Sequence, residues 1–260
     1  MENTLFYNPL GFIILLKKEI NRFMKVYIQT TIAPLLSNIL FLGVFGGLLK
    51  TRQVGIDGVG YLQFLVPGLS AMGAIFAAFQ NPSFSLISQK YQNTIQDLNS
   101  YPLSNFEKVL AFILGGTFRG LLIGTLTYIA TIIFVGYKIK YPAVFFISLI
   151  NASLIFSSLS VLIGLSINSF EKMNFILAII ITPLTYFSGV FFEVLKISRL
   201  PSYVIYINPI YSIINLTRFG YLGHYEGSLL IHILLLAFYT ILLFIMALIF
   251  FKKGIGLKIK

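Results

Sequence analysis

Long apolar segments alternate with short polar ones along this 260-residue chain. Six segments are apolar almost throughout: residues 27–49, 61–79, 109–137, 143–167, 173–192 and 229–251. Each is long enough to cross a hydrocarbon core of about 30 Å as a helix, because roughly 20 residues rising about 1.5 Å each cover that distance. The pattern predicts an all-α membrane protein whose six transmembrane helices form a single domain over residues 1–260.

Residues 11–25 have a different pattern, with a helical period. Their apolar and polar positions fall on opposite sides of a helix: Ile13, Leu16, Ile20 and Phe23 on one side, and Lys17, Lys18, Asn21, Arg22 and Lys25 on the other. This pattern is typical of a helix that lies in the membrane interface. We therefore expect an amphipathic interfacial helix before the first span, with a frayed polar lead-in as the alternative.

The chain turns polar between the second and third spans, over residues 81–108. Apolar residues such as Ile95 and Leu98 are interleaved there with polar ones. Tyr101-Pro102 should end any helix, because a residue before Pro avoids the helical region. This stretch predicts a short amphipathic helix on the membrane surface.

Residues 193–227, between the fifth and sixth spans, are not one apolar run. Pro201, Asn208-Pro209 and scattered charges divide them into short apolar patches. We expect short extracytoplasmic helices here that dip into the interface.

Composition agrees with a lipid environment, since 57% of residues are hydrophobic and 10% are charged, against roughly 45–50% and 25% in soluble proteins. The net charge is +11. Lys and Arg lie mostly at the ends of apolar segments, which favours contact with membrane lipid over nucleic acid. Six spans place both termini on one side, and the polar segments of that side hold the larger share of Lys and Arg. We therefore expect both termini in the cytoplasm.

The third span carries Gly116, Gly120 and Gly124 at four-residue spacing, which favours close helix packing. It also contains Arg119, whose exposure to hydrocarbon would cost at least about 2.5 kcal/mol. Arg119 should therefore face the helix bundle. Two roles stay open for it: a residue that holds helices together, or a group that lines a path for an anionic cargo.

Catalytic chemistry is scarce in the sequence. No carboxylate lies deep in a predicted span, although ion-coupled carriers usually keep one there. His224 and His232 have no second ligand at metal-binding spacing, so both are expected to be structural. Residues 46–51 lack the Gly before Lys of a phosphate-binding loop. We expect no catalytic residue, metal site or nucleotide site in this chain, and an energy source in a partner protein.

Several motifs resemble those of one family. Residues 182–192 (TPLTYFSGVFF) are similar to the signature of the permease subunit of type-2 ATP-binding-cassette (ABC) exporters. It is followed, in the family's order, by Leu200-Pro201, Asn208-Pro209-Ile210, Arg218 and residues 220–223, and residues 101–104 are similar to the family's stretch between spans two and three. One bacterial subgroup of inner-membrane permeases is resembled by Lys18-Glu19, Arg22-Phe23, Gln29-Thr30, Gly115-Gly116 and Arg119-Gly120. The resemblance covers nearly the whole chain and points to the bacterial inner-membrane permeases of the drug and polysaccharide export group. Glu193 departs from it, because many relatives carry Pro at that position.

The resemblance implies an assembly and a cargo class. The chain would be a half-transporter that works as a homodimer with two copies of a cytoplasmic ABC ATPase. ATP and Mg would bind to that ATPase, with no cofactor in this chain. The cargo would be an amphiphile, a polysaccharide, a lipid or a drug, moved by alternating access across the inner membrane, and spans one and five would form the dimer seam.

The resemblance also implies roles for particular residues. Coupling to the ATPase would fall to Gln92, Ile95, Asp97, Leu98, Pro102 and Leu103, together with residues 11–25. The translocation path or gate would include Arg119, Pro183, Thr185, Ser188, Gly189 and Phe191. The remaining family motif residues are Asn208, Pro209 and Arg218.

Two other functional classes fit the span pattern. One is a channel or secondary carrier, whose transport would collapse with the proton gradient while ATP is held constant. The other is a membrane scaffold or assembly factor, to which no ATPase would bind.

Overall fold

The computed structural model describes residues 8–49, 59–136, 139–197 and 202–257, and these residues form helices and connecting turns without a strand. Within these residues, six helices or helical stretches are long and apolar enough to cross a membrane. The predicted all-α fold with six spans is therefore confirmed.

The helical elements follow one another in a simple order. The first half of the chain forms α1 (Pro9–Met24), the π-helical η1 (Ile28–Ile32), α2 (Ala33–Leu49), α3 (Tyr61–Tyr91), α4 (Asp97–Ser100) and α5 (Asn105–Val135). The second half forms α6 (Pro142–Ser166), α7 (Phe170–Ile176), η2 (Leu177–Ile181), α8 (Thr182–Thr185), η3 (Tyr186–Val190), α9 (Val194–Ile197), α10 (Ser202–Tyr206), α11 (Pro209–Leu222) and α12 (Leu229–Lys252).

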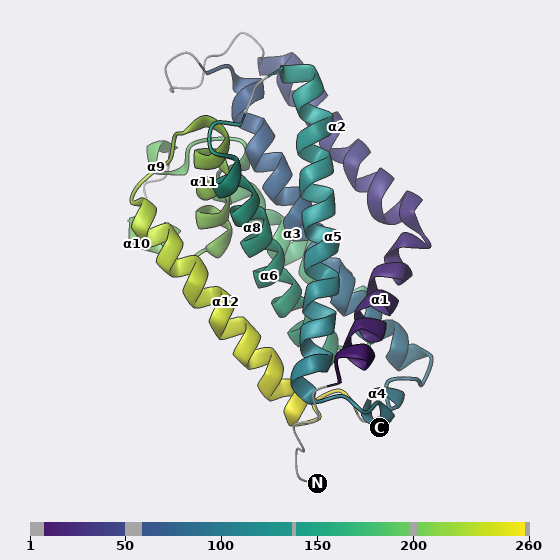
Figure 1. Cartoon of the computed structure of the whole chain (residues 1–260). Coiled ribbons are helices and arrows are strands. Elements are labelled where there is room, and N and C mark those ends of the chain that lie inside the picture. The colour runs from purple at the N-terminus through teal and green to yellow at the C-terminus, as the bar shows by residue number, and fades with distance from the viewer. Residues whose placement is uncertain (1–7, 50–58, 137–138, 198–201, 258–260) are drawn as a thin grey trace.

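Helix α3 is the centre of the bundle. It packs mainly against α5 and α6. In its most apolar 18-residue stretch, 83% of the residues are buried, against 11% in the corresponding stretches of the first and last spans. Helix α12 crosses one side of the bundle and α2 lies at the opposite side (Figure 1). The start of α1, α4 and the end of α12 lie at one end of the molecule, which we name the α1/α4 end, and α9 and α10 lie at the other, the α9/α10 end (Figure 1).

The glycine stripe of α5 packs as the sequence predicts. A Cβ atom at Gly120 would lie 2.8 Å from the carbonyl oxygen of Ala74 on α3. A Cβ atom at Gly116 would lie 2.7 Å from Cβ of Ser157 on α6. Real Cβ atoms do not approach so closely, so the missing side chains let α5 pack directly on its two neighbours.

The predicted end of the second span at residue 79 is wrong, because α3 continues through Pro82 to Tyr91. Pro lacks the amide hydrogen and disturbs the helical hydrogen bonds of the preceding turn. Hydroxyl groups replace those bonds here: the Ser83 amide donates to Ser160 Oγ at 2.7 Å, and the Phe79 carbonyl oxygen accepts from the hydroxyls of Ser83 and Ser160. The surface helix predicted for residues 81–108 is thereby reduced to the four-residue α4.

The other long spans differ from prediction mainly at their ends. Helix α5 begins at Asn105 rather than residue 109, because Ser104 and Glu107 form a capping box. It ends before Gly136, which has a φ of 65°, and Tyr137, the predicted last residue, lies outside the described residues. Helices α6 and α12 agree with prediction to within one residue.

The fifth span is a succession of α and π segments rather than one regular helix. Two π segments, η2 and η3, flank α8, in which Pro183 occupies the first turn. Gly189 has a φ of 95°, in the left-handed region that favours glycine, and it turns the chain out of the helical path. The span ends at Val190, two residues before the predicted end.

The segment after the fifth span is buried more deeply than predicted. Helix α11 packs against α6, α3 and α12, and most of its side chains are inaccessible to solvent. It is therefore an internal helix of the bundle, whereas α9 and α10 are short helices at the α9/α10 end (Figure 1). Pro201, predicted to divide this segment, lies outside the described residues.

Helix α1 is amphipathic, but a different side of it faces the protein. Leu15, Glu19 and Phe23 are buried against the bundle, whereas Ile13 is 55% exposed. Helix α1 packs on α5, and its exposed apolar residues remain available to the lipid interface.

Candidate functional site

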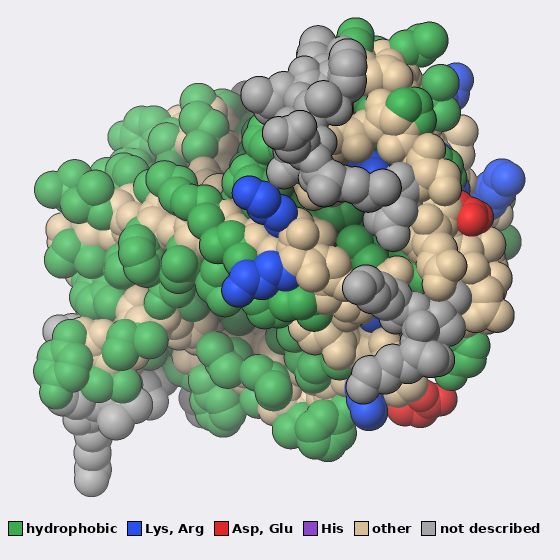
Figure 2. Space-filling view, turned by 90° about the horizontal axis from the view of Figure 1, so that it is seen from below, with side chains coloured by type: hydrophobic (Ala, Val, Ile, Leu, Met, Phe, Trp, Pro, Cys, Tyr) green, Lys and Arg blue, Asp and Glu red, His purple; other side chains and the backbone are tan. Residues whose placement is uncertain are grey.

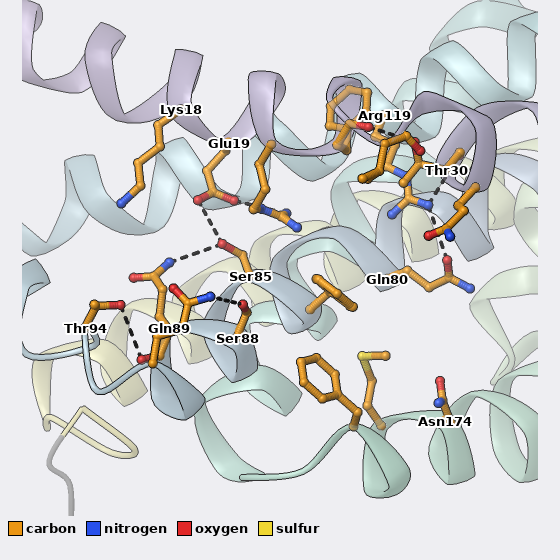
Figure 3. Close-up of a pocket in the computed structure, with 18 of the residues that line it drawn as sticks. Lys18, Glu19, Thr30, Gln80, Ser85, Ser88, Gln89, Thr94, Arg119 and Asn174 are labelled. Carbon is orange, nitrogen blue, oxygen red and sulfur yellow. Dashed lines mark hydrogen bonds and ion pairs between the residues drawn. The ribbon is translucent and has the colours of Figure 1, made fainter.

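A cavity of about 790 Å³ opens between α1, η1, α3, α5 and α7, toward the α1/α4 end. Helix α1 forms one wall, α7 the facing wall and α3 the floor between them (Figure 3). Lys18, Glu19 and Arg22 of α1 and Arg119 of α5 contribute its charged groups, with Asp97 at the rim. Its volume lies within the range of about 300–1,000 Å³ that is usual for ligand pockets.

Glu19 is fully buried and its charge is compensated. One oxygen accepts from Ser85 Oγ at 2.9 Å, and the other accepts from Arg22 Nη2 at 3.3 Å. Arg22 also donates to the carbonyl and side-chain oxygens of Asn81, each at 2.8 Å. Gly115 makes room for Glu19, because a Cβ there would lie 2.8 Å from the Glu19 Cβ. These contacts fix α1 to α3 and α5 at the edge of the cavity.

Arg119 faces the bundle, as predicted, and lines the cavity. Its Nη2 lies 3.4 Å from the carbonyl oxygen of Thr30 and 3.4 Å from Gln80 Oε1, both uncharged acceptors (Figure 3). Its Nε atom is buried without a hydrogen-bond partner, and no carboxylate of the described residues pairs with it. Arg119 thus carries a charge that the described chain leaves uncompensated.

The residues predicted to couple to an ATPase divide into buried anchors and exposed groups. Ile95 and Leu98 are 1% exposed, within an apolar cluster with α3, α5, α6 and α12. Gln92, Asp97 and Pro102 are exposed, and the Pro102 carbonyl oxygen accepts from Asn8 Nδ2 at 3.5 Å. Leu103 is half-buried beside Gly11 of α1. Residues 92–103 therefore form a fixed segment with a polar outer surface, which we name the α4 platform.

Two charged side chains that the sequence pattern did not single out, the buried Glu107 and the half-buried Lys90, tie this platform to its surroundings. Glu107 accepts from the Asn8 amide at 2.8 Å through one oxygen and from the Ser104 amide at 2.8 Å through the other. Lys90 donates to three carbonyl oxygens at the end of α6, at 2.7 to 2.9 Å. The S-x-x-E capping pattern at Ser104 was the one sequence signal that pointed to Glu107.

A second polar cluster lies at the α9/α10 end, around Arg218. The Arg218 side chain is 1% exposed, donates to the Gly189 carbonyl oxygen, and stacks 3.9 Å from the centre of the Phe64 ring. Burial lowers the pKa of Arg218 to about 10, and the carboxylates of Glu226 and Glu193 oppose that shift. Arg218 therefore remains charged at neutral pH.

Glu226 is the main acidic partner in this cluster. It accepts from the Tyr211 hydroxyl at 3.2 Å and from the Leu195 amide at 3.3 Å. Burial raises the pKa of Glu226, although these hydrogen bonds and Arg218 act in the opposite direction. The cluster thus joins α11 to the start of α9.

Both histidines lie near this cluster. His232 Nδ1 lies 3.0 Å from Ser212 Oγ and its Nε2 lies 2.8 Å from the Glu226 carbonyl oxygen. His224 Nε2 lies 3.2 Å from Oε1 of Glu193, the residue that departs from the family pattern. Within the described part of the chain, no group of three or more His, Asp or Glu is placed to hold a metal ion.

The motif residues of the fifth span and of α11 come together in the structure. Asn208 caps α11 and donates to Ser188 Oγ at 2.6 Å, while Arg218 binds the Gly189 carbonyl oxygen. Pro209 occupies the first turn of α11. The kink at Gly189 is therefore held by two side chains that lie some 20 to 30 residues later in the sequence.

The other predicted path residues lie away from the cavity. Thr185 is buried and its hydroxyl donates to the carbonyl oxygen of Ile181 at the end of η2, and Pro183 is half-buried in α8. Phe191 contacts the first span, with its ring centre 4.9 Å from that of Phe45. Among the predicted path residues, Arg119 lines the cavity, whereas the others belong to the fifth span and its bend near the α9/α10 end.

Comparison with known proteins assigns a family to this arrangement. A family model described as "ABC-2 type transporter" matches residues 11–222. The chain is 28% identical over 241 residues to the inner membrane transport permease YadH of Escherichia coli K12, covering 93% of this chain and 94% of that protein. It is 26% identical over 182 residues to Nodulation protein J of Azorhizobium caulinodans, covering 69% and 71% of the two chains.

Proposed function

Because this chain belongs to the ABC-2 type transporter family, and so is the membrane permease subunit of an ABC transporter, we propose that it exports an amphiphilic cargo by alternating access. It is a multi-pass inner-membrane protein, and the ATPase is a separate subunit. The assembly, the orientation, the path and the direction of transport are what we propose for this chain.

The observation that carries the proposal is the cavity at the α1/α4 end. It combines charged groups with an apolar wall that includes Phe84 and Phe170, as an amphiphile would require. The cavity borders the exposed residues Gln92 and Asp97 of the α4 platform. An ATPase seated on that platform would therefore act next to the cargo entrance.

Charge supports a cytoplasmic location for the α1/α4 end. Seen from that end, Lys and Arg side chains lie over the surface and Asp and Glu side chains are fewer (Figure 2). Basic residues concentrate on the cytoplasmic side of membrane proteins. Both termini would then be cytoplasmic, and the Arg218 cluster would lie toward the outer face.

Membership of the family supports assembly as a homodimer with two ATPases. The first and fifth spans would form the seam, and both expose apolar side chains: Leu36, Leu40 and Val44 of α2, and Phe175, Ile179 and Ile180 of the fifth span. Each ATPase would bind ATP and Mg and transmit closure through α4 and α1. The Gly189 kink and α11 would form the outer gate.

A pairing and transport assay tests this proposal. The full chain would be co-expressed with the ABC ATPase encoded nearest to it, and affinity purification should yield two copies of each subunit. Asp97→Lys should weaken that pairing at least tenfold, whereas Lys252→Glu, an exposed change at the same end, should not. Retention of the ATPase by Asp97→Lys would show that α4 is not the coupling surface, and absence of any ATP-dependent transport by the purified pair would overturn the exporter assignment.

A further inference from the structure

We propose that the cavity binds an amphiphile through an anionic headgroup of the phosphate class, and that Arg119 is the residue that recognises it. This inference rests on the proposed function, because it assigns a substrate class to the same path. It chooses the second of the two roles that the sequence left open for Arg119.

Charge balance is the first argument. Lys18, Arg22 and Arg119 line the cavity, with Glu19 and Asp97 as its acidic groups. Glu19 is already occupied by Arg22 and Ser85, and Asp97 is exposed at the rim. The cavity therefore retains an excess of positive charge at its buried end, where Arg119 is 5% exposed.

Unsatisfied donors are the second argument. The Nε atoms of Arg119 and Arg22 are both buried without a hydrogen-bond partner in the described structure, although buried charges are normally paired. Arg22 and Arg119 also repel each other. An oxyanion in the cavity would supply acceptors for both guanidinium groups and remove their repulsion, since Arg binds phosphate and carboxylate oxygens in a forked geometry.

The apolar part of the lining is the third argument, because it distinguishes an amphiphile from a small soluble anion. The cavity is lined by Phe23 and Val26 from α1 and the turn after it, by Phe84 from α3, and by Phe170 and Met173 from α7. The rings of Phe84 and Phe170 lie 4.9 Å apart and form a continuous aromatic surface. A headgroup at Arg119 would thus leave its apolar tail against this wall.

The chain contains no Trp, which makes a direct binding assay available. Phe84 is 46% exposed, so Phe84→Trp should place the chain's single tryptophan in the cavity without disturbing the fold. The full chain would be reconstituted in phosphatidylcholine nanodiscs and titrated with brominated phosphatidic acid or brominated phosphatidylcholine as quenchers. Phosphatidic acid should quench at a roughly tenfold lower mole fraction, the ratio that one charge-assisted hydrogen bond supplies.

Two variants on that background test the role of Arg119. Arg119→Gln should abolish the preference for phosphatidic acid. Gln80→Glu should also abolish this preference while Arg119 is still present, because it places a carboxylate about 3.4 Å from Arg119 Nη2. This second variant still tests the role of Arg119 if Arg119→Gln does not fold. Lys252→Gln, outside the cavity, should leave the preference unchanged.

The outcomes separate the alternatives. Equal quenching by both lipids, or a preference that survives both cavity variants, would overturn the proposal. Displacement of the lipid by millimolar inorganic phosphate would overturn the requirement for an apolar tail. The assay uses neither ATPase nor transport, so its failure would leave the proposed exporter function standing, and failure of ATPase pairing would leave the lipid site standing.

Discussion

Two buried arginines in this bundle should respond differently to the same substitution. Arg218 and Arg119 are 1% and 5% exposed, and each is changed to Gln. Arg218 compensates two carboxylates and stacks on Phe64, whereas Arg119 contacts two uncharged oxygens at 3.4 Å. We therefore expect Arg218→Gln to destabilise the protein strongly, and Arg119→Gln to leave its stability unchanged or raise it.

The loss of stability expected for Arg218→Gln follows from the carboxylates that it leaves buried without a cation. Truncating one member of a buried ionic group costs about 3–5 kcal/mol, because the remaining charge stays buried. The hydrogen bond to the Gly189 carbonyl oxygen and the contact with Phe64 fall within this sum rather than adding to it, since energies of neighbouring contacts are not additive. For Arg119, two long contacts to neutral acceptors are offset by relief of its burial, so a change within about 1 kcal/mol is expected.

Thermal unfolding of the detergent-solubilised chain measures the difference. The fraction of monodisperse protein left after heating gives an apparent Tm for each variant. Arg218→Gln should lower that Tm by at least roughly 6 °C, at 2–4 °C per kcal/mol for a chain of this size, with Arg218→Lys as an intermediate control. Equal losses for the two arginines would refute the argument, because both would then be structural ion-pair residues.

Three further predictions concern other parts of the molecule. Burial raises the pKa of Glu226, so the folded state binds this proton at a higher pH than the unfolded state does. The stability of the unmodified chain relative to Glu226→Gln should therefore rise as the pH falls through the raised pKa. The opposite slope in pH-dependent unfolding would contradict this prediction. Gly120→Val should separate α5 from α3 and abolish monodisperse expression, because its Cβ would lie 2.8 Å from the Ala74 carbonyl oxygen. Leu98→Ala should lower the free energy of unfolding by about 2–5 kcal/mol and lower the Tm. Asp97 is exposed, so Asp97→Lys should leave the Tm within about 2 °C of the unmodified chain. A lowered Tm for both variants would make α4 a purely structural element.

The six spans followed directly from the sequence because a lipid environment requires long apolar helices, which leave an unmistakable pattern. The glycine stripe of α5 was predicted for a similar reason, since the absence of side chains at helical spacing has one common use. The extension of α3 beyond residue 79 was not predictable in this way. It depends on the hydroxyl of Ser160, which lies 77 residues after Ser83 in the chain.

The polar sites were harder to predict because they too depend on residues that lie far apart in the sequence. Glu19 belongs to a basic amphipathic helix in the sequence, and its burial depends on Ser85 of α3 and on the space left by Gly115. The residues of α11 form an interrupted polar segment in the sequence, yet Arg218 becomes buried because Phe64 and Gly189 surround it. Such long-range compensation has no local pattern. The motif resemblance did single out Asn208 and Ser188, and Arg218 and Gly189, which the structure joins as two hydrogen-bonded pairs.

The unbroken length of α3 has a mechanical consequence. Its 31 residues extend about 46 Å at about 1.5 Å per residue, which exceeds a hydrocarbon core of about 30 Å. A rigid rod of that length amplifies rotation, so tilting it by about 5° displaces its tip by about 4 Å. The hydroxyl hydrogen bonds at Pro82 stiffen α3 at one of its two internal prolines, so a small movement at one surface of the bilayer is carried along the helix to the other.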